Sequence, residues 1–297
     1  MDVSKFKTEI GKRLQNGFEH DLLDASLQNL VDKCNRLRFN NFAYSLRELT
    51  RHILERLAPN DNVLNTAWFS PHDPEEPKKI TRKQRMKYAI QGGLPDDYVK
   101  NTLKIDVDII GKKVGNSIDL LSKYTHINPE SFYIEVEKIE ELFGKVMDAV
   151  ILLFQTIEES RALLTQKLEE NVNKTVISNL FYETLNSIDC LATHYSIEDF
   201  TVDDITLLDI DDTTVYFKAT GEVNVKLQYG SDGDLKRDNG MTLNGDFPFT
   251  GEFNGRIKEG LTNFELETDT FEVNTDCYWG DDYIDECIEE EIRKTSD

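Results

Sequence analysis

Apolar residues recur every three or four positions over the first two thirds of the chain, which is the spacing of amphipathic helices. The stretch 18–37 carries one such stripe, formed by Phe18, Leu22, Leu23, Leu27, Leu30, Val31 and Cys34. A second stripe runs through 42–57, where Asn40 and Asn41 are candidate N-caps and Pro59 follows the last apolar position. The pattern therefore predicts two neighbouring helices near the N-terminus.

Further helices are expected in the middle of the chain. Residues 107–124 keep helical spacing, and the triplet Asn128–Glu130 is the clearest helix start in the sequence. It combines an asparagine cap, a proline at the first helical position and an acid in the first turn. From there the apolar positions stay in register to about Asn171, and a last helix is expected at 176–185.

Near Cys190 the apolar spacing changes from three or four residues to two. The segment 222–229 alternates strictly between apolar and polar residues, as a half-buried strand does, and Gly230–Gly233 signals a turn. Further strands are expected at 247–257 and 263–274.

Helices followed by strands indicate the α+β class. We expect an N-terminal all-helical bundle over residues 1–190. A small antiparallel β-sheet domain, acidic and closed by a short C-terminal helix through Ile284, Ile288 and Ile292, is expected over 191–297.

The charge is unevenly distributed. The chain of 297 residues has a net charge of −22, and residues 201–297 hold 25 acidic but 8 basic residues, against 31 and 26 in residues 1–200. A uniformly acidic chain binds nucleic acid poorly, because an acidic surface repels phosphate backbones, but this uneven distribution leaves nucleic-acid binding open for the nearly neutral helical part.

Cysteine usage and hydropathy indicate a soluble cytoplasmic protein. Cys34, Cys190, Cys277 and Cys287 lie far apart, without the paired spacing of a metal site, which favours reduced thiols. No segment approaches the roughly 20 apolar residues of a membrane span, and the N-terminus lacks the apolar core of a signal peptide. We expect no membrane contact.

Arg47 and His52 are the first candidates for chemistry, because they form the pattern R-x4-H within 46–57. A histidine can move a proton near neutral pH and an arginine can hold a phosphate, as in metal-independent ribonucleases. Residues five apart on a helix are separated by about 140°, so a third group or a second subunit would have to complete the site. The alternative is that both are polar flanks of an amphipathic helix.

A basic run provides the second set of candidates, namely Lys78, Lys79, Arg82, Lys83, Arg85 and Lys87. Such a cluster could bind a phosphate backbone or an acidic partner. The alternative is that it forms a solvated helix face. His126, just before the Asn128 cap, is a third candidate that could reach a site on another helix or simply satisfy the backbone of its turn.

Two acidic groups remain, one formed by Asp209, Asp211 and Asp212 and the other by Asp232, Asp234 and Asp238. Either could bind a hard cation through its oxygens, but neither has the spacing of a complete calcium loop. We expect neither a metal nor another cofactor.

Four stretches resemble bacterial proteins described as predicted pPIWI-associating nucleases. They are 40–59 (NNFAYSLRELTRHILERLAP), 80–94 (ITRKQRMKYAIQGGL), 120–132 (LLSKYTHINPESF) and 222–249 (EVNVKLQYGSDGDLKRDNGMTLNGDFPF). The resemblance implies a nuclease role in a prokaryotic conflict system.

The helical part is also similar to HEPN domains, all-helical ribonucleases of anti-phage defence whose motif is an arginine, four to six residues and a histidine. Arg47 and His52 match this motif, although here it lies in an early helix rather than the last one.

These features together favour an effector nuclease of a prokaryotic defence system, of the metal-independent RNase type. Arg47 would contact phosphate, His52 would act as general acid and base with help from His126, and the basic run would follow the backbone. The expected partners are nucleic acid, RNA before DNA, other defence-system proteins and a second copy of the chain in a homodimer. The alternatives are a non-catalytic sensor or scaffold that binds nucleic acid or protein, and an antitoxin-like partner that masks a basic protein.

Overall fold

The computed structural model describes residues 3–15, 17–110, 112, 122–172, 192–257 and 265–275. The chain divides into two compact units. The first comprises Met1–Lys167 together with Ile210–Thr213 and Ile257–Thr262, and the second comprises Leu168–Asp209, Thr214–Arg256 and Asn263–Asp297. The predicted boundary near residue 190 lies outside the described residues.

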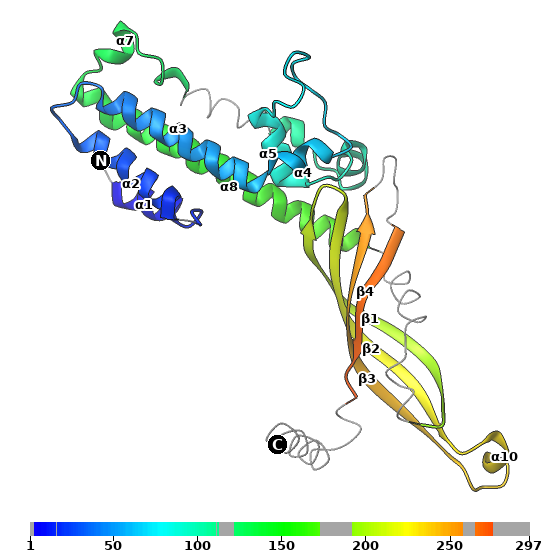
Figure 1. The fold of residues 1–297 in the computed structure, drawn as a ribbon. Coiled ribbons are helices and arrows are strands. Elements are labelled where there is room, and N and C mark those ends of the chain that lie inside the picture. Colours follow the sequence, from blue (N-terminus) through cyan, green and yellow to red (C-terminus); the bar gives the residue numbers. More distant parts are fainter. Residues whose placement is uncertain are drawn as a thin grey trace, which may run out of the picture. The chain divides into compact units, whose positions relative to one another are not determined.

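Helices make up the N-terminal region (Figure 1). In chain order they are α1 (Val3–Gly11), α2 (Gly17–Val31), α3 (Arg38–Leu57), α4 (Asn60–Asn65), α5 (Arg82–Gln91), the π-helix η1 (Tyr98–Thr102), α7 (Pro129–Phe132) and α8 (Val136–Asn171).

Helix α3 is central to the first unit. Its apolar stripe of Phe42, Leu46, Leu49 and Ile53 is buried, and Phe42 packs against Phe143 of α8 with ring centroids 5.4 Å apart. Helix α3 ends at Leu57, before Pro59, as the sequence predicts. Because one side of α3 faces this core, its polar side must face outward.

The predicted caps of α3 are wrong. Helix α3 begins at Arg38, so Asn40 and Asn41 lie inside it. Asn40 is buried, and its side-chain amide donates to the carbonyl oxygen of Tyr124 at 3.0 Å. Helix α2 likewise ends at Val31, earlier than the apolar stripe suggested.

The predicted cap at Asn128 is confirmed. Its side chain accepts a hydrogen bond from the backbone of Ser131, and the Ser131 hydroxyl accepts one from the Asn128 backbone in return. The helix that it starts, however, is the short α7. Helix α8 begins separately at Val136 and ends at the predicted Asn171.

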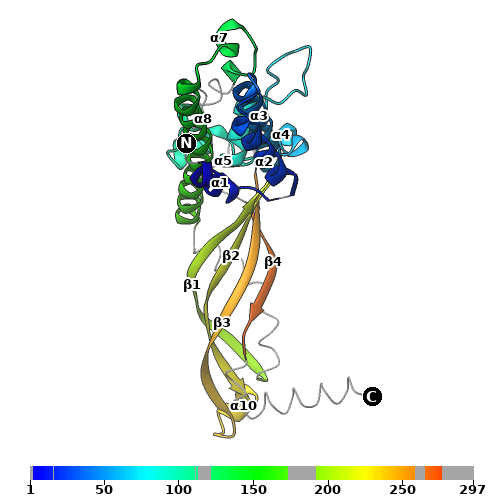
Figure 2. The ribbon, with the colours of Figure 1, turned by 90° about the vertical axis from the view of Figure 1, so that its left-hand side faces the viewer.

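The second unit contains a four-stranded antiparallel sheet in the order β1-β2-β3-β4, whose strands run side by side and twist (Figure 2). The strands are β1 (His194–Ile210), β2 (Thr214–Tyr229), β3 (Met241–Arg256) and β4 (Glu265–Val273). Val223, Val225 and Leu227 of β2 are buried, which confirms the alternation seen in the sequence. The predicted turn after β2 contains a short helix, α10 (Asp232–Leu235). Helices followed by this sheet confirm the α+β class.

A tight turn, Ile210–Thr213, belongs to the first unit. The backbone nitrogen of Gly93 donates to the carbonyl oxygen of Asp211 at 2.8 Å, and the Asn62 amide donates to the Asp212 carboxylate at 3.2 Å. A Cβ at Gly93 would lie 2.0 Å from the carbonyl oxygen of Asp212, so this position requires glycine.

Several expectations fall outside the described residues. These are the helices at 176–185 and 284–292, most of the helix at 107–124, Cys190, Cys277 and Cys287. Cys34 is described, and its thiol is exposed and free. Within the described residues, every helix is too short or too polar to cross a membrane.

Candidate functional site

The outward side of α3 carries a row of polar side chains that we call the charged face of α3. It comprises Tyr44, Arg47, Glu48, Arg51, His52 and Glu55. Tyr44, Glu48, Arg51 and Glu55 follow one line along the helix, because residues three and four apart lie on the same side. Arg47 and His52 lie on opposite flanks of this line, as their helical spacing requires.

Arg51 is held between two carboxylates. Its Nε donates to Glu48 at 2.9 Å and its Nη1 donates to Glu55 at 2.7 Å. The hydrogen bond to Glu48 raises the pKa of Arg51 above its usual value. Burial raises the pKa of Glu48, but hydrogen bonds and charge from Arg51 and Arg47 outweigh burial and leave that pKa below its ordinary value. The row is therefore charged and ordered at neutral pH.

His52 lies against Arg51. The Nη2 of Arg51 is 3.2 Å from the Nε2 of His52. Because a guanidinium can only donate, this contact fits a neutral imidazole that accepts at Nε2. The ring also packs against Phe18 in a T-shaped arrangement with centroids 5.0 Å apart.

Arg47 lies against another segment, the corner at 122–128. Its Nη1 donates to the hydroxyl of Thr125 at 3.2 Å, and its guanidinium lies over the ring of Tyr44 at 5.5 Å. His126, the next residue along, is exposed, and its carbonyl oxygen accepts from Ser131. The structure thus brings Arg47 to the His126 corner, while His52 meets Arg51 and Phe18.

Arg85 of the basic run is a structural residue. It is buried, and its guanidinium donates at 2.6 Å both to the carbonyl oxygen of Ala58 and to the side chain of Asn60. Burial lowers the pKa of Arg85, while the charge of Glu55, 3.5 Å away, opposes that shift. Arg85 therefore joins the charged face of α3 to the start of α4.

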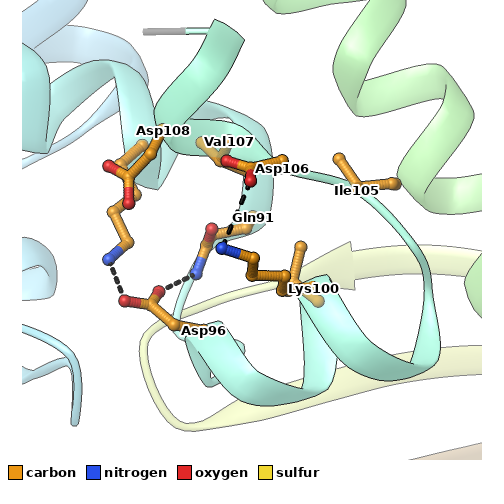
Figure 3. Close-up of a pocket in the computed structure, with 9 residues that line it drawn as sticks. Gln91, Asp96, Lys100, Ile105, Asp106, Val107 and Asp108 are labelled. Atoms are coloured by element: carbon orange, nitrogen blue, oxygen red, sulfur yellow. Dashed lines mark hydrogen bonds and ion pairs between the residues drawn. The ribbon is translucent and has the colours of Figure 1, made fainter.

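Two lysines of the run pair with aspartates. Lys87 lies 2.5 Å from Asp96 and 4.4 Å from the centre of the Trp68 ring, and Lys83 lies 2.8 Å from Asp108. Both aspartates line a hollow of about 30 Å³, in which Gln91 and Lys100 also reach Asp96 and Asp106 (Figure 3). A hollow of that size holds about one water molecule, so it is no substrate pocket.

The remaining members of the run differ in exposure. Lys78 and Lys79 are exposed, Lys79 pairs with Glu76, and Arg82 is half-buried on the first turn of α5. The run therefore presents a few outward cations near 78–83, whereas Arg85 and Lys87 stabilise the fold.

Two family models match the chain, over residues 11–150 and 157–279, and both describe a predicted pPIWI-associating nuclease. The chain belongs to this family. No curated protein and no solved structure matches it. The charged face of α3, the His126 corner and the basic run all lie within the first matched segment of this predicted nuclease.

Arg51 is the residue of this predicted nuclease that the motif pattern missed. The pattern paired His52 with Arg47, but the arginine in contact with the imidazole is the one directly before it. The spacing of Glu48, Arg51 and Glu55 was a usable signal, since opposite charges three and four apart on a helix pair along its surface.

The acidic groups of the predicted nuclease serve local structure. Asp234 accepts from Ser231 at the start of α10, and Asp232 accepts from Gln228 at 3.0 Å. Asp211 accepts from the backbone of Thr213. Across the described parts of the chain, no three acidic, histidine or cysteine side chains are grouped as a metal would require.

Proposed function

We propose that this protein cleaves RNA without a metal ion, using the charged face of α3, as an effector of a prokaryotic defence system that works with a pPIWI protein. One observation carries the choice of site. Arg51, fixed by Glu48 and Glu55, places a guanidinium against the Nε2 of His52. A phosphate-binding cation next to a proton acceptor is the minimum that RNA transesterification needs.

The reaction proposed is attack of a ribose 2′-oxygen on the adjacent phosphorus. The 2′-hydroxyl takes the place of the Arg51 Nη2 at His52 and gives its proton to Nε2. The Nη2 then donates to the phosphate oxygens, while the Nε and Nη1 keep their bonds to Glu48 and Glu55. The bond from the 2′-oxygen to phosphorus forms and the bond from phosphorus to the 5′-oxygen breaks. The departing 5′-oxygen takes a proton from a general acid, which is a histidine of a second copy in this proposal, and His52 afterwards gives its proton to water while that histidine regains one. The products are a 2′,3′-cyclic phosphate and a free 5′-hydroxyl.

Arg47 would hold a neighbouring phosphate in this proposal. Its guanidinium is anchored to Thr125 and lies over Tyr44, whose ring is 52% exposed and can stack on a base. His126 on the same corner, and Lys78 and Lys79 of the basic run, would extend the path of the strand. A second copy of the chain, facing this surface, would add another histidine to protonate the 5′-oxygen.

The test is cleavage of a labelled RNA hairpin and of its DNA counterpart in the presence of a chelator. We expect the parent protein to cut the RNA and leave a 2′,3′-cyclic phosphate, and His52→Ala to lose cleavage by about 100-fold or more. His72→Ala, in an exposed loop, is the matched control and should cut like the parent. Undiminished cleavage by a His52→Ala, Arg51→Ala double variant would refute the assignment.

A non-catalytic RNA-binding subunit is the second candidate. It is favoured by the contact between Arg51 and His52, which occupies the nitrogen that a general base needs. In that case the parent and His52→Ala would bind RNA equally, and neither would cut it under any condition that permits binding.

A further inference from the structure

A second concave site lies in the first unit, apart from the charged face of α3. It is a pocket of about 270 Å³ between α3, α5, α8 and the loop after α1, and we call it the α3–α8 pocket. Its size is close to the lower end of the roughly 300–1,000 Å³ of small-molecule sites.

The floor of the α3–α8 pocket is apolar. Ile53 of α3 and Phe154 and Ile157 of α8 belong to the buried core and line the pocket, together with Ala89 and Leu57. A flat apolar ring placed on this floor would remove further apolar surface from water, which stabilises binding.

The rim of the pocket is positively charged. Lys12, Arg13, Arg56 and Arg161 line it, and Glu158 is the acidic residue among its lining residues. Glu9 pairs with Lys12 at 2.7 Å and Glu19 with Arg56 at 3.1 Å, so four cations stand against three carboxylates here. That is still a net positive charge, in a chain with 34 basic and 56 acidic residues. Charge complementarity therefore favours an anionic ligand.

The rim guanidinium groups are held in place. Arg13 makes two bonds to Glu158, at 2.7 and 2.8 Å, and a third to the carbonyl oxygen of Glu9. Arg56 donates to the buried carboxylate of Glu19 at 3.1 Å and to the carbonyl oxygen of Arg13 at 2.9 Å. Side chains ordered in advance lose little entropy when a ligand binds.

We propose that the α3–α8 pocket binds a nucleoside phosphate, with the base on the apolar floor and the phosphate at the cationic rim. The ligand is either a free nucleotide or the phosphorylated end of a strand, since both present the same group. This site is separate from the proposed cleavage chemistry, because none of its lining residues belongs to the charged face of α3. Binding can therefore be tested whether or not the protein cuts RNA.

The experiment is calorimetric titration of the full chain with four probes: AMP, adenosine, inorganic phosphate and a 5′-phosphorylated tetraadenylate. We expect saturable binding of AMP, and binding of adenosine and of phosphate at least about tenfold weaker, because each lacks one half of the ligand. A tetraadenylate that binds more tightly than AMP would identify a strand end as the source. Phosphate binding as tightly as AMP, or no saturable AMP binding, would overturn the proposal.

Two variants assign the binding to this pocket. Lys12→Glu reverses a rim charge and should weaken AMP binding by about tenfold. Because the exposed Lys12–Glu9 pair is lost, we expect the free energy of unfolding to fall by less than about 1 kcal/mol. Ala89→Phe fills the pocket without touching a charge and should abolish binding. Lys33→Glu, an exposed reversal outside the pocket, is the control and should bind like the parent. AMP affinity unchanged in Lys12→Glu would place the ligand elsewhere.

Discussion

Nη2 of Arg51 lies 3.2 Å from Nε2 of His52, although the two residues are neighbours in sequence and their side chains leave the helix about 100° apart. The long side chain of Arg51 lies along the helix surface because its guanidinium donates to both Glu48 and Glu55. The arginine best placed to work with His52 is therefore Arg51.

Substitution of Arg51 should reduce cleavage without unfolding the protein. We expect Arg51→Ala to lower the cleavage rate by about 100-fold, and Arg51→Lys by about tenfold, because lysine keeps the charge but loses the planar fork. Exposed helix pairs contribute roughly 0.3–0.5 kcal/mol each, so the free energy of unfolding should fall by about 1 kcal/mol or less. RNA cleavage and urea unfolding measure the two effects. Equal rates for Arg51→Lys and the parent would show that the fork is not used.

Acid should weaken the helical unit partly through Glu48. Its pKa is lower folded than unfolded, so its contribution is present above the unfolded value of about 4.3 and is lost as pH falls through the folded pKa. Glu48→Gln should therefore be less stable than the parent at pH 7, and this difference should shrink towards pH 3. Because the side chain is 25% exposed, we expect less than about 1 kcal/mol.

The control for that titration is Glu75→Gln, in the exposed loop before α5. Its unfolding curves should follow the parent at every pH. If the difference in unfolding free energy between Glu48→Gln and the parent stayed constant from neutral to acid pH, the pH dependence could not be assigned to Glu48.

The basic run should separate into structural and binding members. Arg85→Ala leaves the Ala58 carbonyl without its donor and should cost about 2–4 kcal/mol of unfolding free energy. Lys78→Ala should leave the free energy of unfolding unchanged but weaken RNA binding. The slope of the logarithm of RNA affinity against the logarithm of salt concentration should fall by about one, because one fewer counterion is released. Urea unfolding and RNA binding at several salt concentrations distinguish them. If Lys78→Ala bound RNA as tightly as the parent, the basic run would not be part of the RNA-binding surface.

Gly93 should tolerate no side chain. The Cβ of Gly93→Ala would lie 2.0 Å from the Asp212 carbonyl oxygen, so the turn must move, and we expect a loss of more than about 2 kcal/mol. Gly144→Ala on α8 is the matched control, because a Cβ there meets no neighbouring atom within 4 Å. That helical substitution should instead stabilise by about 0.5–1 kcal/mol. Equal melting temperatures for the two variants would contradict the tight approach at Gly93.

Long periodic segments were predictable from the sequence. Helix α3 before Pro59, the cap at Asn128 and the alternating strand around Val223–Leu227 all depend on local rules, which hold when no distant residue interferes. Asn40 shows where such rules fail. An asparagine before an apolar stripe is typical of a helix N-cap. Here the side-chain amide of Asn40 instead donates to the carbonyl oxygen of Tyr124, 84 positions away.

The candidate site was predictable only in part. The sequence identifies α3 and its arginine–histidine pattern, and the helical angle indicates that Arg47 and His52 need another group. That the other group is Arg51 depends on which rotamer its two carboxylates select, and that Arg85 is buried depends on the carbonyl of Ala58. The spacing of Glu48, Arg51 and Glu55 indicates their pairing, but neither the contact with His52 nor the burial of Arg85 follows from residue spacing.

The turn Ile210–Thr213 has a consequence for the order of folding. Asn62 and its partner Asp212 are separated by 150 positions, and the backbone of Gly93 also donates to Asp211 of this turn. During synthesis at about 5–20 residues per second, the early helices would emerge roughly ten seconds before their last contact is available. A fragment that stops before residue 210 would lack that contact permanently, so the isolated helices should be purified with the turn still attached.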